Sequence, residues 1–428
     1  MPTALPLLET LPLFTEKQRR LHVVLVDEEL PYPPISGKRI RTLNLTLRLA
    51  KRHRLTYFCH RNADPQEAEL AKAFFHEHDI ETVVVNRSVP SKSGPMFYAR
   101  LAANLLSPLP YSVSTHASSE LVDAVQRYAS THDVDLWHCE WTPYAHSLRA
   151  LHNARRVVMA HNVESLIWQR YHETESNTLK RWYIGRQWRK FERFEQRAFA
   201  EATRTIAVSS EDADLMRRRF GASRIDVVEN GVDTDFFQPV DDSRDPKTIL
   251  FLGSLEWRPN LDGVKLLLDK VFPAVRSEEP NARLCLVGRN PPDWLRRQVT
   301  ELAGVELHAN VADVRPFLAR VGQLAVPLRI GGGSRLKILE ALAMRLPVVS
   351  TRIGAEGLCL EANRHLSVVE SIDEMAAALV RTMRHPLTAA RQAEAGRQVV
   401  LAHYDWDSLA DKMDQVWQNC CSQPAKPV

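Results

Sequence analysis

Three consecutive glycines, followed by two cations and a carboxylate, form the stretch of this sequence with the clearest capacity for chemistry. The segment VPLRIGGGSRLKILEALAMRLPVVST contains, in order, Gly331, Gly332, Gly333, Ser334, Arg335, Lys337 and Glu340. An apolar strand ending at Leu328 and a helix beginning near Ser334 would gather unpaired backbone N–H groups at the positive end of the helix dipole. Arg335 and Lys337 in the first turn are unfavourable there unless an anion neutralises them. The stretch therefore predicts a diphosphate site; a glycine turn with solvent-facing cations is the alternative.

Glu340 stands further along the same helix, within reach of a group attached to a bound phosphate. A carboxylate accepts two hydroxyl hydrogen bonds, which is how proteins commonly hold a ribose. A solvated glutamate is the alternative, but the flanking ILEALA makes this helix mostly apolar. Neither GxxxxGK(S/T) nor GxGxxG after the first strand is present, so the sequence indicates neither a P-loop nucleotidase nor a dinucleotide dehydrogenase.

Polar residues also follow apolar runs in the first half of the chain. His161 and Glu164 end the strand-like run RRVVMAHNVES, and ligands of parallel α/β sheets bind at such strand ends; a structural histidine is the alternative. Ser36, Gly37 and Arg39 occupy the first predicted strand-to-helix loop, where Gly37 permits close approach of a ligand. For Ser36 and Arg39, a helix-initiating turn is supported equally well.

No metal site or other cofactor is predicted. The acidic pair Asp233 and Asp235 follows Asn230-Gly231 in a turn, where such side chains usually bond their own backbone rather than a cation. The six cysteines have neither zinc-ligand spacing nor the pattern of a disulfide framework, which favours a reducing cytoplasm. No uninterrupted apolar run approaches the roughly 20 residues that a membrane span needs.

The elements that must position these residues alternate between strand and helix along the chain. Near-continuous apolar strands such as LHVVLV, ETVVV and TILFLG, separated by helical segments, predict parallel sheets. With 428 residues, 44% hydrophobic and 25% charged, the chain suits two globular domains. We predict an α/β fold with two Rossmann-like, doubly wound parallel-sheet domains that face each other across a cleft. The predicted units are an N-terminal arm (1–20), an N-terminal domain (21–238), a C-terminal domain (239–400) and a C-terminal helix (401–428).

Seven segments follow one another in the order typical of one enzyme family. They are PPISGKRIRTLNLTLRLAKRHRLT, HNVES, AVSSEDADLMRRRFG, ENGVDTDFF, FLGSLEWRPN, LVGRN and ILEALAMRLPVVST. Through them most of the chain resembles the family 4 group of retaining GT-B glycosyltransferases. The resemblance implies a nucleotide sugar bound mainly on the C-terminal domain, transfer with retention of anomeric configuration without a bound metal, and a last helix that crosses back to the N-terminal domain.

The resemblance also implies roles for individual residues, with His161 at the donor sugar and the first loop near the acceptor. The expected catalytic residues are His161, Arg335, Lys337 and Glu340. The expected donor and nucleotide site comprises Gly253, Ser254, Arg258, Gly288, Val311, Gly331, Gly332, Gly333, Ser334 and Glu340. The expected acceptor side comprises Ser36, Gly37, Arg39 and Glu164.

The sequence departs from the family pattern at the donor-sugar carboxylate. Glu340 matches the second glutamate of the family's Glu-x7-Glu, but Gly332 stands where the first belongs. No pair of carboxylates at a suitable spacing suggests a covalent double displacement. We therefore favour front-face attack assisted by the leaving phosphate, as the family implies.

A second departure concerns the charge that binds the diphosphate. A serine rather than an arginine follows Gly253, and Asn260 stands near the place of a lysine. A diphosphate left unpaired in a cleft would be costly. We therefore expect Arg335 and Lys337, together with Arg258, to supply the positive charge.

The sequence does not determine what two basic segments contact. Lys38 to Arg54 and Lys180 to Arg197 mix cations with apolar side chains, and the second contains two tryptophans. Such helices suit the surface of an anionic membrane, and a solvated or core-packed face is the alternative. Nucleic-acid binding is not predicted, because no recognised nucleic-acid-binding module is present.

The sequence as a whole predicts a retaining glycosyltransferase. It would move a sugar from a nucleotide-diphosphate sugar to a saccharide or lipid-linked saccharide, in polysaccharide or glycolipid biosynthesis. A GT-B nucleotide-sugar epimerase or hydrolase and a non-catalytic protein that binds nucleotide sugars are the alternatives. The expected location is the cytoplasm, with peripheral contact at the inner face of the cytoplasmic membrane left open.

Overall fold

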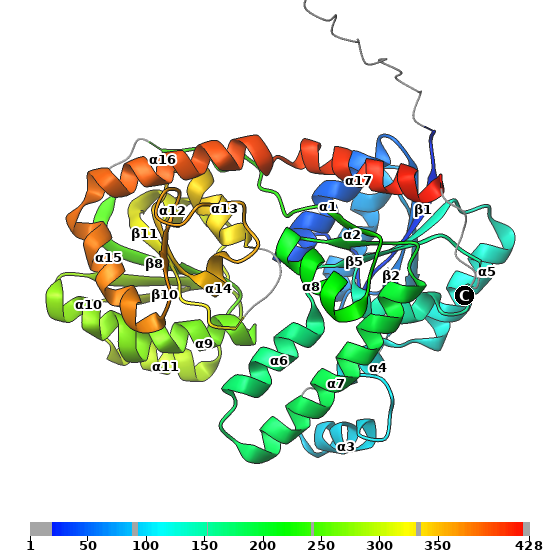
Figure 1. Ribbon diagram of the computed structural model, residues 1–428, viewed down its shortest axis with the longest axis horizontal. Helices are drawn as coiled ribbons and strands as arrows, with labels where there is room; N and C mark the ends of the chain where they lie inside the picture. The colour runs from blue at the N-terminus through cyan, green and yellow to red at the C-terminus, as the bar shows by residue number, and fades with distance from the viewer. Residues whose placement is uncertain (1–18, 88–92, 152, 241–243, 331–334, 423–428) are drawn as a thin grey trace, which may run out of the picture.

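The computed structural model describes residues 19–87, 93–151, 153–240, 244–330 and 335–422. Four predicted site residues, Gly331, Gly332, Gly333 and Ser334, lie outside these ranges, as do residues 1–18 of the predicted N-terminal arm. Two lobes stand side by side, each built on its own sheet (Figure 1).

Within the described residues, seven parallel strands form the sheet of the N-terminal lobe in the order β3-β2-β1-β4-β5-β6-β7. The strands are β1 (His22–Val26), β2 (Arg54–His60), β3 (Glu81–Val85), β4 (Leu136–Cys139), β5 (Arg156–Ala160), β6 (Arg204–Ala207) and β7 (Ile225–Val227). The helices are α1 (Gly37–Ala50), α2 (Pro65–Glu77), α3 (Pro95–Asn104), α4 (Tyr111–His116), α5 (Ser119–Thr131), the 3-10 helix η1 (Thr142–Leu148), α6 (Glu164–Thr174), α7 (Thr178–Glu201) and α8 (Ser210–Phe220). The central strands are apolar along their length because helices cover both faces of the sheet.

The sheet of the C-terminal lobe has six parallel strands among the described residues, in the order β10-β9-β8-β11-β12-β13. The strands are β8 (Asp245–Leu252), β9 (Arg283–Gly288), β10 (Val305–Ala309), β11 (Val321–Val326), β12 (Val348–Thr351) and β13 (Ser367–Val369). The helices of this lobe are α9 (Arg258–Leu266), the π-helical turn η2 (Leu267–Val271), α10 (Phe272–Glu278), α11 (Asp293–Glu301), α12 (Arg315–Arg320), α13 (Leu336–Ala343), α14 (Arg352–Ala355), the 3-10 helix η3 (Ile372–Glu374), α15 (Met375–Arg384) and α16 (Pro386–His403). The last helix of the chain is α17 (Trp406–Cys421).

The predicted α/β class with two doubly wound parallel sheets is confirmed. Strand order reverses between β1 and β4 and between β8 and β11, so the carboxyl ends of these strands are the expected ligand-binding edges. The sequence did not predict β7 and β13, because three residues each are too few to show a periodicity. The domain boundary at 238/239 falls between β7 and β8 and stays a prediction.

The chain passes between the lobes twice. After β7 it runs forward to β8, and between α16 and α17 it returns, so that α17 lies against α1 of the N-terminal lobe (Figure 1). The apolar face of α17, at Leu409, Met413, Val416 and Trp417, is buried in the core of that lobe. The two passes meet where the backbone N–H of Val232 donates a hydrogen bond to the carbonyl of Tyr404 (2.9 Å).

Candidate active site

The end of strand β8 gathers three residues of the C-terminal lobe around one backbone position. Lys337 Nζ donates a hydrogen bond to Asn260 Oδ1 (3.0 Å), and Asn260 Nδ2 donates one to the carbonyl of Ser254 (2.8 Å). A Cβ atom added at Gly253 would lie 2.7 Å from Asn260 Nδ2 and 2.8 Å from Lys337 Nζ. Gly253 has a φ of 156°, which residues with a side chain rarely adopt, and the absence of a Cβ atom leaves room for the ammonium group beside the backbone at the strand end.

The neighbouring predicted residues have mainly packing roles in this structure. A Cβ atom at Gly288 would lie 2.0 Å from the carbonyl oxygen of Gly253, so a glycine at the end of β9 is needed for close approach of the two strand ends. Ser254 Oγ donates a hydrogen bond to Glu256 (3.3 Å), and Val311 packs against the core of the lobe. Their predicted contacts with a nucleotide stay predictions.

Helix α13 begins at Leu336, two residues later than predicted, with Arg335 as its N-cap. Lys337 therefore lies in the first turn and Glu340 one turn further along the helix. Burial, and then the charge of Arg335, lowers the pKa of Lys337 to about 7. Burial raises the pKa of Glu340 to about 7, although the charge of Lys337 partly opposes this shift. Both groups are thus poised to change charge near neutral pH when a ligand arrives.

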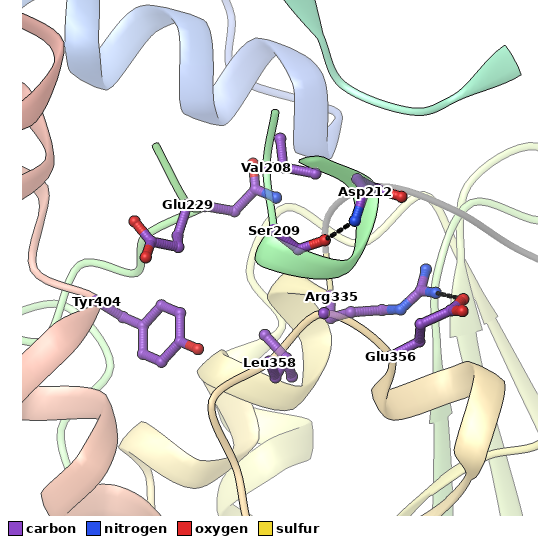
Figure 2. A pocket seen from close by; sticks show the side chains of 10 residues that line it. Val208, Ser209, Asp212, Glu229, Arg335, Glu356, Leu358 and Tyr404 are labelled. Carbon is purple, nitrogen blue, oxygen red and sulfur yellow. Dashed lines mark hydrogen bonds and ion pairs between the residues drawn. The ribbon is translucent and has the colours of Figure 1, made fainter. Parts of the chain in front are cut away.

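The Arg335 side chain points toward Glu356 in the region where the two lobes meet (Figure 2). Its guanidinium donates a hydrogen bond to the carbonyl of Ile353 (2.8 Å) and lies 3.7 Å from Glu356 Oε2. Arg170 of α6 donates two hydrogen bonds, each 2.9 Å long, to the same Glu356. The predicted sharing of a diphosphate by Arg335 and Lys337 stays a prediction, and the geometry favours Lys337 as the cation beside the strand end.

A pocket between the lobes is lined by residues of both. Arg335, Glu356 and Leu358 line it from the C-terminal lobe, and Ser209 and Asp212 from the N-terminal lobe (Figure 2). Burial raises the pKa of Asp212 to about 6, although the nearby charge of Arg335 opposes the shift. The pocket therefore brings a half-buried carboxyl group of one lobe beside a buried cation of the other.

Arg258, the third expected diphosphate ligand, contacts the other lobe instead. Its guanidinium lies 3.1 Å from Glu175 and stacks over the ring of Tyr171, at 4.5 Å from the ring centre. Ile330, the last described residue before the glycines, also packs among buried side chains of α6 and α7, including Ile167 and Ile184. Helix α6 therefore contacts both Arg258, at the start of α9, and Ile330, just before the glycine stretch.

His161 lies one residue beyond strand β5 and is 8% exposed. Its Nε2 atom lies 3.4 Å from Oε1 of Glu140, the residue that follows the neighbouring strand β4. Burial lowers the pKa of His161, so the neutral imidazole is the prevailing form at pH 7. A neutral imidazole at a strand end can exchange hydrogen bonds with sugar hydroxyl groups.

The expected acceptor-side residues are held by partners within the N-terminal lobe. Ser36 is the N-cap of α1 and its hydroxyl accepts a hydrogen bond from the backbone N–H of Arg39 (3.3 Å). The Arg39 guanidinium is paired with Glu29 and Glu67. Glu164 accepts a hydrogen bond from Trp141 Nε1 (3.0 Å) at the start of α6. Of the two alternatives for Ser36 and Arg39, the structure favours the helix-initiating turn.

Sequence reasoning did not identify Glu140 as a candidate site residue. Glu140 is 3% exposed and contacts both His138 and His161. A signal was available, because Glu140 ends the apolar strand LWHC just as His161 ends RVVMA. Polar residues at the carboxyl ends of adjacent parallel strands meet at one edge of the sheet.

The described residues contain no group of three or more His, Cys, Asp or Glu side chains placed to hold a metal ion. At the acidic pair considered in the sequence, the Asp233 carboxylate accepts hydrogen bonds from the backbone N–H groups of Asp235 (3.1 Å) and Phe236 (2.9 Å). This carboxylate therefore closes a local turn.

The pKa of Lys337 leads to a testable pH dependence of diphosphate binding. A bound diphosphate favours the protonated ammonium, so binding of UDP or GDP should take up a proton above pH 7. We expect Kd to rise by up to about tenfold per pH unit between about pH 7 and pH 9, where the phosphate itself is already ionised. Calorimetric titrations across this range measure the effect. Lys337→Arg should remove the dependence because arginine stays charged, and a flat wild-type profile would contradict the assignment.

Comparisons with known proteins agree with this architecture. The sequence matches the description Glycosyltransferase Family 4 over residues 35–236 and the description Glycosyl transferases group 1 over residues 246–385. Glycogen synthase of Mycobacterium tuberculosis is 25% identical over 295 residues, which cover 65% of this chain and 69% of that protein. Phosphatidyl-myo-inositol mannosyltransferase of Mycolicibacterium smegmatis is 33% identical over 230 residues, or 50% of this chain and 56% of that protein.

A solved structure shows the same fold over almost the whole chain. Sucrose-phosphate synthase from Thermosynechococcus elongatus superposes with a TM-score of 0.70 at 18% sequence identity, and the match covers 94% of this chain and 99% of that one. The two family descriptions together account for both lobes. The chain therefore belongs to glycosyltransferase family 4, the retaining GT-B enzymes that transfer a sugar from a nucleotide sugar.

Proposed function

We propose that this glycosyltransferase binds its nucleotide diphosphate at the end of β8, with Lys337 as the cation beside Gly253 and Glu340 as the ribose ligand. The hydrogen-bonded group of Lys337, Asn260 and the backbone after Gly253 carries this proposal, because it places a titratable cation at a strand end where ligands of doubly wound sheets bind. The donor sugar lies near His161, and the acceptor enters past Gly37 at the start of α1.

The proposed reaction uses the leaving diphosphate rather than a protein nucleophile. A retaining transfer develops positive charge on the sugar and negative charge on the departing phosphate. Lys337 at the strand end stabilises the departing phosphate, and the buried polar groups around His161 hold the sugar. Closure of the two lobes would exclude water from the reacting atoms.

A binding and turnover screen tests this proposal. UDP, GDP and ADP are titrated by calorimetry, and UDP-glucose, GDP-mannose and ADP-glucose are then offered with saccharide and lipid-linked acceptors. Selective binding of one diphosphate and transfer with retained anomeric configuration are the expected results. Absence of binding by all three diphosphates at millimolar concentration would overturn the donor-site assignment.

We further propose that an exposed face of the N-terminal lobe contacts an anionic membrane surface. On α7, Leu179, Trp182, Arg186, Arg189 and Arg193 recur at three- and four-residue spacing and are all exposed, so they share one solvent-facing stripe. A tryptophan and a leucine beside a row of arginines is the arrangement expected of an interfacial helix. No helix among the described residues is long and apolar enough to cross a membrane.

Helix α3 contacts α7 and carries further exposed apolar side chains. Its last residue, Asn104, accepts hydrogen bonds from Gln187 (3.0 Å) and Lys190 of α7, and the two helices lie side by side in Figure 1. Met96 and Tyr98 on α3 are about two-thirds exposed (67% and 68%). The sequence contains no acidic residue in 93–119 or in 176–191, so the α3–α7 surface favours anionic partners.

The other basic segment of the sequence does not form a membrane-facing surface. Arg41 of α1 is fully buried, and Arg48 and Arg52 of the same segment are paired with Asp407 and Asp411 of α17. Helix α17 covers α1, which the sequence could not show because the two helices are more than 350 residues apart. The membrane interpretation therefore rests on the α3–α7 surface.

Vesicle binding tests the membrane proposal. We expect the protein to sediment with vesicles that contain phosphatidylglycerol, and to remain in solution with pure phosphatidylcholine. The double variant Leu179→Ser/Trp182→Ser should lose more than about tenfold in partitioning, because each apolar side chain contributes about 1.5 to 3 kcal/mol when buried. The matched control Leu387→Ser/Trp294→Ser changes exposed residues of the C-terminal lobe and should bind as the wild type does. Equal loss in both double variants would contradict the proposal.

A further inference from the structure

Buried polar side chains connect the C-terminal helix α17 to the residue proposed at the donor sugar. Trp417 Nε1 donates a hydrogen bond to His138 Nδ1 (2.9 Å), and His138 Nε2 lies 2.9 Å from Glu140 Oε2. The other carboxylate oxygen of Glu140 accepts a hydrogen bond from Thr42 Oγ1 (2.8 Å) and lies 3.4 Å from His161 Nε2. His138 and Glu140 are two residues apart in extended chain, so their side chains share one face of the sheet.

Each of these groups is shielded from water. Trp417 and His138 are at most 1% exposed, and Glu140 is 3% exposed. Burial raises the pKa of Glu140, but the contacts with His138 and His161 outweigh burial and hold this pKa well below its ordinary value. Glu140 is therefore a buried carboxylate whose negative charge is stabilised by the two imidazole rings.

The indole N–H of Trp417 determines which nitrogen of His138 carries the proton. Because a donor faces Nδ1, that nitrogen must accept, and the proton of the neutral ring lies on Nε2, facing Glu140. The same carboxylate lies 3.4 Å from Nε2 of His161, and its negative charge favours a proton on that nitrogen. Nδ1 of His161 is then left as a hydrogen-bond acceptor.

Two cations near His161 also favour the neutral form of its ring. Lys38 and Arg41, both on α1, oppose a positive charge on the ring, while Glu140 is the anion that faces it. A neutral ring with a lone pair on Nδ1 can accept a hydrogen bond from a sugar hydroxyl group but offers no donor at that atom to a phosphate oxygen.

We propose that Glu140 is a positioning residue that fixes the orientation and the Nε2–H tautomer of His161, and that Trp417 couples helix α17 to this arrangement through His138. The inference rests on the proposed place of His161 at the donor sugar. It specifies the ligand chemistry of that place, because His161 then accepts from a hydroxyl group of the sugar. The C-terminal helix also becomes part of the support of the active site.

Imidazole nitrogen NMR on protein labelled with ¹⁵N-histidine tests the tautomers without any turnover. The His138 and His161 signals are assigned from His138→Asn and His161→Asn, and both rings should show the Nε2–H form at neutral pH. Trp417→Phe should let His138 populate the Nδ1–H form. Trp406→Phe is the matched control: Trp406 is equally buried on the same helix, and its indole N–H has no hydrogen-bond partner in the described part of the chain. An Nδ1–H form of His161 in the wild type would overturn the proposal.

Kinetics with Glu140→Gln provide the second arm of the test. The donor is the one of UDP-glucose, GDP-mannose and ADP-glucose that the wild type turns over. We expect kcat of Glu140→Gln with this donor to be about 10- to 100-fold lower than that of the wild type. The Kd of the free nucleoside diphosphate should stay within about twofold, because Glu140 acts through His161 and not on the diphosphate. Glu140→Asp, which keeps the charge, should recover part of the loss, and thermal unfolding of each variant reports any loss of stability.

The outcomes separate this inference from the proposed function. If His161→Ala keeps the kcat of the wild type, the proposed role of His161 at the donor sugar is wrong. An impaired His161→Ala variant together with a fully active Glu140→Gln variant would overturn only the positioning role. Trp417→Phe should lower kcat several-fold while Trp406→Phe does not, and equal effects of the two would contradict the coupling through His138.

Discussion

Replacing Glu340 by alanine is expected to remove most of the affinity for the nucleotide part of the donor. The proposed ribose contact consists of two hydroxyl hydrogen bonds to a half-buried carboxylate on α13. Their loss should cost about 2 to 4 kcal/mol, which corresponds to a factor of about 30 to 700 in Kd. Calorimetric titration with UDP and GDP, on the wild type and on Glu340→Ala, measures this difference.

Two further variants make the Glu340 result specific. Glu301→Ala removes an exposed carboxylate from α11 of the same lobe and should leave Kd unchanged. Glu340→Gln keeps the size and one acceptor atom, so it should lose less affinity than alanine does. Titration with the ribose-free ligand inorganic diphosphate should respond little to any of the three changes. A Glu340→Ala variant that binds UDP and GDP as tightly as the wild type would exclude the ribose assignment.

Replacing His161 by alanine should reduce turnover rather than nucleotide binding. The imidazole is a preorganised hydrogen-bonding group beside the proposed position of the donor sugar, and removal of such a group typically lowers kcat by about 10²- to 10³-fold. The Kd of UDP or GDP should change by less than about twofold, because the proposed diphosphate site lies in the other lobe. Steady-state release of the nucleoside diphosphate from the donor measures kcat, and calorimetry measures Kd.

The His161 variant also needs a check on folding. Removal of the imidazole leaves Glu140 with Thr42 and His138 as partners, so the buried carboxylate still has polar contacts. His308→Ala, which changes a half-exposed histidine on β10 of the C-terminal lobe, serves as the control and should keep wild-type kcat. Equal loss of kcat and of nucleotide affinity in His161→Ala would contradict a role confined to the sugar.

Local sequence patterns were sufficient to predict the fold class and the polar residues at several strand ends. Apolar strands followed directly by polar residues predicted β5 and His161, because burial on both faces of a parallel sheet is visible in a few residues. The close approach of Asn260 and Lys337 to Gly253 could not be predicted locally. These two side chains come from two different helices.

Pairing between charged residues was the part of the site that the sequence could not predict. Arg258 and Arg335 were both expected at a diphosphate, yet in this structure Glu175 and Glu356 face them. Glu175 lies in the other lobe, and no local pattern connects it to Arg258. The contact of Trp417 with His138 is a similar case, because 279 residues separate a helix from a strand that each look ordinary in sequence.

The hydrogen bond between Val232 and Tyr404 has a mechanical consequence for the whole enzyme. Two chain segments cross between the lobes at this point and are tied to each other, so neither can swing independently of the other. If the lobes close on each other, the two segments must bend together near this hydrogen bond, as at a hinge. A small angular change there becomes a larger linear displacement at the distant ends of α6 and α9, where Glu175 and Arg258 make or break contact. The Glu175–Arg258 ion pair joins the two lobes, so it would be sensitive to such a motion.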